Sequence, residues 1–342
     1  GETQDALDLG RETVTLQQLL GIELNERAAA LAELVLWIGY LQWQIRTNGQ
    51  ASVAEPVVHD YGNIEHRDAV LAYDGTEPMT DAQGQVLTRW DGVTFKPHPV
   101  TGQPVPDEAA QVVQWRYLNP RQAVWPRADF IVGNPPFIGN KRMCDALGDG
   151  YVDALRATWP DVPESADFVM YWWHKAAQSV CTGQVERSGL ITTNSLTMIF
   201  NRRVVEAALT GALAGTGAGH AGGLMLPNAQ KSASGIPHPG AGVAHLVFAV
   251  PDHPWVDSAN GAAVRIAMTV LAPGQAEGRL LTVAEEREAD NGEVDVDLSS
   301  RQGLIHADLK VGANLTRCAK LIANAGLPYM GMIPLGSGFW VD

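Results

Sequence analysis

The sequence has few cysteines, no long apolar run and no excess of basic residues. Cys144, Cys181 and Cys318 are the only cysteines among 342 residues, and no two form a CxxC pair. An odd number of widely spaced cysteines favours neither a disulfide framework nor a structural zinc site, so we expect a reducing, cytoplasmic location. No stretch of about 18 uncharged apolar residues occurs. No signal peptide is recognisable at the start, so no membrane partner is expected.

Basic charge is also in short supply. The formal net charge is -14 at pH 7, which argues against a nucleic-acid-binding module with a basic face. It does not exclude a catalytic domain that relies on another domain for its contacts with DNA. The length suffices for one large domain, or for one domain and part of a second.

Apolar segments of strand and helix type alternate along the chain. Gln17–Leu24 is expected to be a buried strand, and Glu26–Arg46 a helix with Asn25 as its N-cap. A strand-to-loop edge is expected within residues 57–72. Further strands are expected at Ala128–Gly133, Gly189–Thr193, His245–Val250 and Ala262–Leu271, and further helices at Asp167–Thr182 and Arg202–Leu213. This order predicts an α/β fold with a mostly parallel sheet and an antiparallel hairpin at one edge.

Two segments interrupt this pattern. Residues 73–120 are rich in turn formers and predict a surface hairpin excursion. Residues 208–243 are interpreted as an insertion rich in glycine and alanine. Within it, Gly217–Gly222 matches GxGxxG by letter, but it follows a helix rather than a strand and no helix follows it. We therefore do not interpret it as a phosphate-binding loop.

One motif carries chemistry. Asn134-Pro135-Pro136-Phe137 follows a predicted strand, and open α/β sheets bind ligands at the carboxyl ends of strands. The exocyclic amino group of a base is a poor nucleophile, because its lone pair is delocalised into the ring. The Asn134 side-chain oxygen and the Pro135 carbonyl can each accept a hydrogen bond from one N–H of this amino group, which frees the lone pair. The paired prolines restrict the backbone and so keep both acceptors aligned. Phe137 offers a flat face on which an extruded base can stack. A proline-stiffened turn without chemistry is the alternative.

The residues around this motif resemble a known family. NPPF after a strand resembles motif IV of the amino-group methyltransferases. The segments LGIELNERAAALAELVLWIGYLQWQ, FIGNKRM, GLITTNS and NRRV resemble the large type IIL restriction–modification enzymes, over nearly the whole chain except residues 208–243. That resemblance implies a Rossmann-like class I methyltransferase fold and S-adenosylmethionine as cofactor. It further implies methyl transfer to the exocyclic amino group of adenine in duplex DNA.

The resemblance also assigns cofactor-binding residues. Glu23, with Ile22, corresponds to the acidic residue that hydrogen-bonds the cofactor ribose, although a carboxylate here also suits the start of a helix. Asp68, with Ala69, corresponds to the motif that receives the cofactor's adenine amino group; the alternative is a solvated loop aspartate. Asn134 borders the cofactor as well as the target base.

Aromatic positions supply the remaining candidates. Asp167, Phe168 and Tyr171 lie in the helix that borders the cofactor adenine in the family, although such a stripe also suits a plain core. Trp255 resembles the aromatic residue that closes the other face of the extruded base.

The chain departs from the family at its start. The glycine-rich motif I turn, which cradles the methionine part of the cofactor, is not present, so we expect the first strand of the sheet to be missing and the chain alone to be inactive. Residues 1–285 are expected to be a partial catalytic domain and 286–342 a connector to a recognition domain. That domain and a nuclease are expected in the same parent chain, and DNA contact through the missing recognition domain accounts for the acidic balance.

Other chemistries are weakly supported. Asp308-Leu309-Lys310 matches the (E/D)xK element of nucleases without a convincing upstream Pro-Asp, and His238 and His245 lack the companions of a metal site. The first rival function is an amino methyltransferase acting on protein glutamine or RNA. The second is a non-catalytic remnant that serves only as an interaction module.

Overall fold

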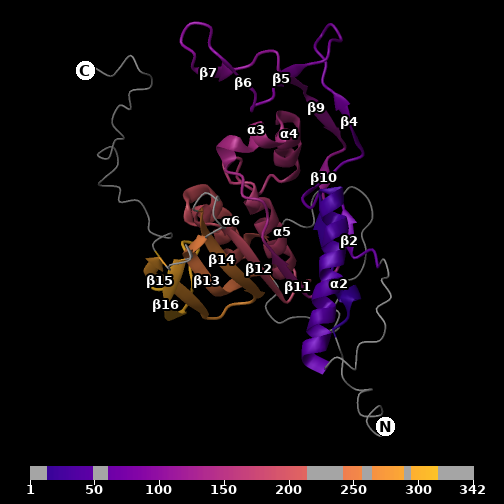
Figure 1. The fold of residues 1–342 in the computed structure, drawn as a ribbon. Helices are drawn as coiled ribbons and strands as arrows, with labels where there is room; N and C mark the ends of the chain where they lie inside the picture. Colours follow the sequence, from indigo (N-terminus) through magenta and orange to yellow (C-terminus); the bar gives the residue numbers. More distant parts are fainter. Residues whose placement is uncertain (1–13, 49–60, 214–241, 256–263, 289–293, 315–342) are drawn as a thin grey trace, which may run out of the picture.

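A computed structural model describes residues 14–48, 61–213, 242–255, 264–288 and 294–314 (Figure 1). The glycine-rich Gly217–Gly222 segment, His238, Cys318 and the chain beyond residue 314 lie outside this part. The proposed boundary between residues 285 and 286 falls within a strand, β15 (Gly278–Glu288), and the division into a catalytic domain and a connector stays a prediction.

The first elements form a small parallel unit. A 3₁₀ turn at Leu16–Gln18 precedes β1 (Gly21–Glu23), so only the end of the predicted strand is extended. Helix α2 (Glu26–Asn48) follows, and β1 then pairs in parallel with β2 (Ile64–His66). Asn25 is the N-cap of α2, as predicted: its Oδ1 accepts hydrogen bonds from the backbone N–H groups of Arg27 at 3.0 Å and Ala28 at 3.1 Å.

Replacing Asn25 by alanine is expected to lower the free energy of unfolding by about 1 kcal/mol, because these two N–H groups then have no side-chain acceptor. Asn25→Asp keeps a side-chain oxygen in place and should restore most of the stability. Urea unfolding followed by circular dichroism measures both. Equal stability of Asn25→Ala and the parent chain would contradict the capping role.

The turn-rich segment forms the predicted hairpin excursion, seen at the top of Figure 1. Three antiparallel pairs are nested within one another: β4 with β9, β5 with β8, and β6 with β7. At their base, β3 pairs with β10. The strands are β3 (Leu71–Ala72), β4 (Gly75–Pro78), β5 (Thr88–Trp90), β6 (Phe95–Pro97), β7 (Pro104–Pro106), β8 (Gln111–Val113), β9 (Trp115–Leu118) and β10 (Arg121–Gln122).

A six-stranded mixed sheet forms the largest layer, in the order β11-β12-β14-β13-β15-β16. Only β11 with β12 and β13 with β15 run parallel; the other three pairs are antiparallel. Its strands are β11 (Phe130–Gly133), β12 (Arg187–Thr193), β13 (Ala244–Trp255), β14 (Val264–Pro273), β15 and β16 (Val294–Gly303).

The prediction of a mostly parallel, Rossmann-like sheet with one antiparallel edge hairpin is therefore wrong for the described residues. The β13–β14 hairpin lies inside the sheet, because β14 also pairs with β12. β15 and β16 extend the sheet beyond it. No strand is predicted there from the sequence, although Val294, Val296 and Leu298 of β16 alternate with acidic residues as in a half-buried strand. β1 and β2 form a separate two-stranded sheet instead of joining β11.

Two helices cover one face of this sheet. Helix α5 (Val169–Cys181) packs on β12 and β14, and α6 (Ile199–Thr210) packs on β13. Trp173 of α5 is buried, and its Nε1 donates to Thr269 Oγ1 of β14 at 3.1 Å. Two shorter helices, α3 (Met143–Leu147) and α4 (Asp149–Thr158), connect this core to the excursion.

Apolar side chains are uncovered on both sides of the break between the two sheets. On β11, Phe130 and Val132 are 60% and 89% exposed. On α2, Leu31, Leu34 and Val35 are at least half exposed and continue a stripe at helical spacing. By length and composition alone, Glu26–Thr47 would also be apolar enough to cross a membrane, although no long uncharged run marks it in the sequence. Because α2 packs on β1 and β2, we interpret the stripe as a surface for packing against protein.

Candidate active site

The NPPF motif lies at the carboxyl end of β11, as the sequence predicts. Gly133, the last residue of β11, is level with Leu190 of β12. Asn134 follows with an exposed side chain, while Pro135 is buried. Phe137 is half-buried and packs against the hydrophobic core. The motif therefore presents the Asn134 side chain at the sheet edge, from a loop that Pro135 and Phe137 attach to the core.

Asp167 anchors the segment that follows the motif. Its Oδ1 accepts a hydrogen bond from the backbone N–H of Asn140 at 3.0 Å. Its Oδ2 accepts from Ser195 Oγ at 2.6 Å and from Asn201 Nδ2 at 2.7 Å. The Asp167 N–H in turn donates to Asn201 Oδ1 at 2.9 Å. One carboxylate thus ties together the loop after β11, the turn after β12 and Asn201 in the first turn of α6.

Phe168 fixes the same loop from the neighbouring position. Its backbone N–H donates to the carbonyl of Ile138 at 2.9 Å. Its ring is buried and stands edge-on to Trp172, at 4.7 Å between centroids, and to Tyr151, at 6.1 Å. Tyr171, one turn further along α5, is fully buried, and burial raises the pKa of its hydroxyl to about 12. In this structure Asp167, Phe168 and Tyr171 hold the scaffold of the site.

Glu23 and Asp68 lie at the same end of the β1–β2 sheet. Glu23 ends β1, level with His66 at the end of β2, and Asp68 follows two residues later. Glu23 Oε1 accepts the backbone N–H of Asn25 at 2.8 Å. Ile22, beside it on β1, is half-buried. The two carboxylates therefore lie at the same edge of this small sheet.

Asp68 has more intramolecular partners than a solvated loop aspartate would have. Its Oδ1 accepts from the N–H groups of Val70 at 2.7 Å and Leu71 at 2.9 Å, and its Oδ2 accepts the Tyr151 hydroxyl at 2.7 Å. The Ala69 carbonyl accepts Trp125 Nε1 at 2.6 Å. Burial raises the Tyr151 pKa well above its usual range, and the nearby Asp68 carboxylate adds to this, so the tyrosine stays a donor.

Tyr151 joins the two halves of the site. Its hydroxyl binds Asp68, next to β2, and its ring packs on Phe168, whose backbone holds the loop after the NPPF motif. Sequence reasoning misses Tyr151, because nothing in the α4 sequence distinguishes it from a core residue. Ser195 and Asn201 belong to the GLITTNS and NRRV segments, but the sequence assigns them no role.

Trp255 lies at the sheet edge that carries Asn134. Thr193 of β12 and His253 of β13 are both level with Ile266 of β14, and Trp255 extends β13 two residues further. Its side chain is 39% exposed. This position agrees with a role beside an extruded base but does not bring Trp255 into contact with Phe137.

The cofactor candidates fit the ribose end of S-adenosylmethionine better than its methionine end. Glu23 is half-exposed at the end of β1, where a carboxylate can accept two vicinal hydroxyls. Asp68 already accepts three intramolecular hydrogen bonds. Among the described residues no strand lies between β1 and β11, so no element is present there to bind the methionine part of the cofactor. The described part of the chain also contains no cluster of three potential metal ligands, and His245 instead contacts the Gly274 carbonyl through Nδ1 at 3.1 Å.

Comparisons with known proteins point to one family. No curated protein matches the chain. Among solved structures, a chain described as the type IIL restriction–modification enzyme MmeI in complex with DNA matches with a TM-score of 0.36 and 21% identity. That match covers 55% of this chain and 20% of the MmeI chain, so this chain spans about a fifth of that protein's length. The family model for the MmeI DNA-methyltransferase domain matches residues 2–199. Because that model covers more than half of the sequence and includes the NPPF motif, the chain belongs to the family of MmeI DNA-methyltransferase domains.

Proposed function

We propose that this domain transfers a methyl group from S-adenosylmethionine to the exocyclic amino group of adenine in duplex DNA, within a restriction–modification system. The observation that carries the proposal is the exposed Asn134 at the carboxyl end of β11, on a loop held by Asp167 and Phe168. We further propose a cytoplasmic location, and a parent chain that also carries nuclease and recognition domains.

The chain's own residues activate and position the amine. The Asn134 Oδ1 and the Pro135 carbonyl each accept a hydrogen bond from one N–H of the amine. These two hydrogen bonds draw the amine nitrogen toward a pyramidal shape. Pro135 is buried, so the loop cannot relax away from the base. Phe137 and Trp255 provide apolar faces for an extruded base. Positioning is then the main contribution to the rate.

The cofactor supplies an electrophilic methyl group on a sulfonium. Glu23 would hold its ribose hydroxyls, and Ile22 would lie beside the nucleoside. Asp68 and Ala69 would border its adenine, with Asp68 already oriented by Tyr151.

Nucleoside analysis tests the function. The domain, joined to a glycine-rich first strand and a recognition domain, is incubated with labelled cofactor and duplex DNA, and the digested nucleosides are separated. N6-methyladenine is expected, and Asn134→Ala should lower its rate of formation about 100- to 1,000-fold, the usual cost of removing one preorganised polar group aimed at a transition state. Asn119→Gly, in the distant excursion at a positive φ that suits glycine, is the matched control.

The other outcomes separate the rival functions. Label in RNA or on protein glutamine, rather than in DNA, would favour the other NPPF-containing methyltransferases. No label in any polymer would favour a non-catalytic remnant. Label on the exocyclic amino group of cytosine would keep the amino-group chemistry but overturn the choice of adenine.

We also propose that the chain alone is inactive. The apolar residues of β11 and α2 are exposed on either side of the break between the two sheets, which is where a first strand and its cofactor-binding turn would pack. Isothermal calorimetry with S-adenosylmethionine should therefore give a dissociation constant far weaker than micromolar. Micromolar binding by the isolated chain would contradict this proposal.

A further inference from the structure

A cleft lined by both polar and apolar residues opens beside the candidate active site and has no role in the function proposed above. Its volume is about 840 Å³. Its rim begins at Asn194, directly after β12, and at Pro251 and Asp252 of β13. The carboxyl end of β12 is next to that of β11, at a strand spacing of about 4.8 Å, so the cleft opens on the sheet edge that carries Asn134. Ser195, next to Asn194, belongs to the Asp167 cluster.

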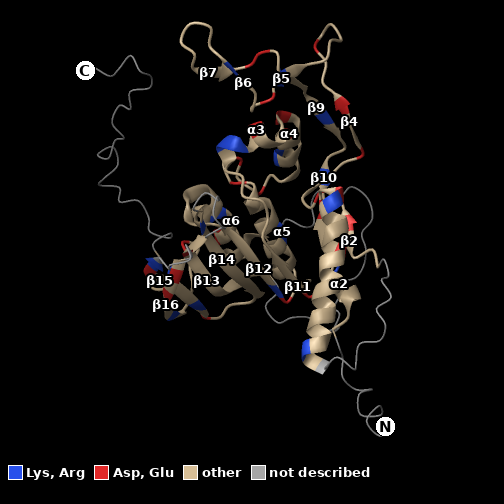
Figure 2. Cartoon of the chain, in the orientation of Figure 1, with Lys and Arg blue, Asp and Glu red and all other residues tan. Residues whose placement is uncertain are grey.

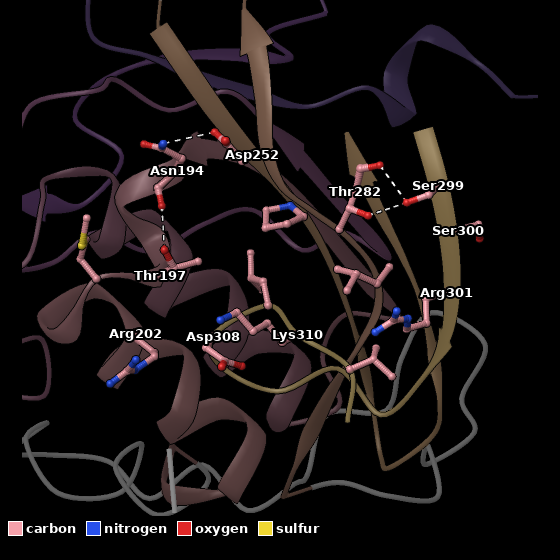
Figure 3. Close-up of a pocket in the computed structure, with 15 residues that line it drawn as sticks. Asn194, Thr197, Arg202, Asp252, Thr282, Ser299, Ser300, Arg301, Asp308 and Lys310 are labelled. Carbon is pink, nitrogen blue, oxygen red and sulfur yellow. Dashed lines mark hydrogen bonds between the residues drawn. The ribbon is translucent and has the colours of Figure 1, made fainter. Parts of the chain in front are cut away.

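Three basic side chains from three different elements line this cleft: Arg202 of α6, Arg301 of β16 and Lys310 of the following loop. Figure 3 shows Lys310 and Asp308 between Arg202 and Arg301. Within the described ranges none of the three cations is in an ion pair. The three cations outnumber the two carboxylates of the lining, Asp252 and Asp308, in a chain whose net charge is -14, and this local excess of positive charge favours an anionic ligand.

The remaining lining residues point to a sugar–phosphate backbone. Thr197, Thr282 and Ser299 supply hydroxyl groups along the cleft, which can hydrogen-bond phosphate and sugar oxygens, and apolar side chains such as Met198, Leu280 and Val311 fill the spaces between the polar groups. No aromatic ring lines it in the described part of the chain, whereas sites for nucleobases and for most small molecules rely on such rings. The chemistry therefore fits a backbone better than a base.

A nuclease centre is the competing interpretation of the same residues. The cleft contains Pro251–Asp252 as well as Asp308-Leu309-Lys310, which together match the letters of a nuclease motif. However, Asp252 is paired with Arg265 at 2.6 Å and accepts Asn194 Nδ2 at 3.2 Å. Figure 3 shows Asp252 and Asp308 at opposite ends of the cleft, and the described residues hold no cluster of potential metal ligands. The motif letters therefore do not form a metal site.

Asp308 has one oxygen, Oδ1, that is buried without a hydrogen-bond partner in the described part of the chain. Next to Lys310 this carboxylate limits how closely a phosphate approaches. Acidic and basic residues are interspersed elsewhere on β15 and β16 (Figure 2). The unpaired positive charge of Arg202, Arg301 and Lys310 is therefore concentrated in the cleft.

We propose that this cleft binds the sugar–phosphate backbone of the DNA strand beside the target base, through Arg202, Arg301 and Lys310. The choice of DNA rests on the proposed function, while the anionic character of the ligand rests on the cleft alone. A small free anion, or an acidic protein segment, would be recognised by the same cations, and the experiment distinguishes them.

The test is the salt dependence of DNA binding by the full chain. A fluorescein-labelled 30-base-pair duplex is titrated in 50 to 200 mM KCl, with the variant Arg202→Gln/Arg301→Gln/Lys310→Gln beside the parent chain. The affinity at 50 mM should fall at least about tenfold, and the slope of log K against log salt should become less negative by about 0.9 for each phosphate that the variant no longer neutralises. Arg279→Gln is the matched control: Arg279 is exposed on β15 next to Leu280, which lines the cleft, so it points to the opposite face.

A second variant keeps the proposal falsifiable if the triple variant is unstable. Asp308→Asn should leave DNA affinity unchanged or raise it, because a negative charge is removed from the lining of the cleft. Four results would overturn the proposal: no duplex binding by the parent chain at 50 mM KCl, equal weakening in the control and the triple variant, weaker binding by Asp308→Asn, or displacement of the duplex by equimolar inorganic phosphate or a poly-glutamate peptide.

The outcome is separable from the methyl-transfer proposal. Asn134→Ala should leave the salt slope unchanged even if its affinity changes, because Asn134 is uncharged and does not line the cleft. If the triple variant changes the salt slope but no N6-methyladenine forms, the DNA-binding role of the cleft is supported and the proposed function is wrong. If N6-methyladenine forms but the triple variant leaves the slope unchanged, the proposed function is supported and the DNA-binding role of the cleft is wrong.

Discussion

Replacing Asp167 by alanine is expected to lower the free energy of unfolding by about 3–5 kcal/mol. The carboxylate accepts hydrogen bonds from Asn140, Ser195 and Asn201, and hydrogen bonds to a charged group contribute about 1.5–3 kcal/mol each. Asn201 is only 4% exposed, so water cannot easily replace the carboxylate as the acceptor for its amide. Urea unfolding of the parent chain and the variant measures the difference.

Two further variants separate this cluster from a general effect of removing a charge. Asp153→Ala removes an exposed carboxylate from α4 and should change stability by less than about 0.5 kcal/mol. Asp167→Asn keeps one acceptor for Asn140 but turns an amide toward Asn201, so it should fall between the two. If Asp167→Ala matched Asp153→Ala, the carboxylate would not be holding the three loops together.

The same cluster shows why part of the site is readable from the sequence. NPPF is recognisable because it follows a short apolar strand, whereas Glu23 and Asp68 are assigned through the resemblance to the family. The structure places all three at the end of a strand or just beyond it. The role of Asp167 is not predictable, because Ser195 and Asn201 come to it from segments 28 and 34 residues away. Their convergence depends on α6 packing against α5, which local periodicity does not encode.

The sheet shows a related limit. The apolar runs locate β11, β12, β13 and β14 to within a few residues, and β13 and β14 are antiparallel as predicted. The prediction of a mostly parallel sheet with this hairpin at its edge is nevertheless wrong, because β14 also pairs antiparallel with β12. A strand buried on both faces has no alternation, so its pattern is the same for parallel and antiparallel neighbours. β14 pairs with β12 as well as with β13, and no residue within the strand indicates this placement. Element type is therefore predictable from this sequence, and topology is not.

The stability of the domain is expected to fall by about 3 kcal/mol between pH 6.5 and pH 4 through His174 alone. This side chain of α5 is 1% exposed, both ring nitrogens lack a partner in the described part of the chain, and its ring stands edge-on to Trp159 at 5.5 Å. Burial lowers its pKa from 6.5 to about 4; Asp161 opposes this shift and Lys175 adds to it. Between those values the unfolded chain binds a proton that the folded chain excludes, and each pH unit contributes about 1.4 kcal/mol.

A difference measurement isolates that contribution from the carboxylates that titrate nearby. His174→Leu fills the same apolar site without a titratable group, so its stability relative to the parent chain should rise steadily as the pH falls from 6.5 to 4 and stay constant from 6.5 to 7.5. Lys175, whose pKa burial lowers to about 8, is charged in both states below pH 6.5 and contributes only at higher pH. His66→Gln, at an exposed position beside β1, is the control and should follow the parent chain. Parallel pH profiles for His174→Leu and the parent chain would mean that the folded protein admits a proton at this buried ring, and that α5 is less tightly packed than its buried side chains indicate.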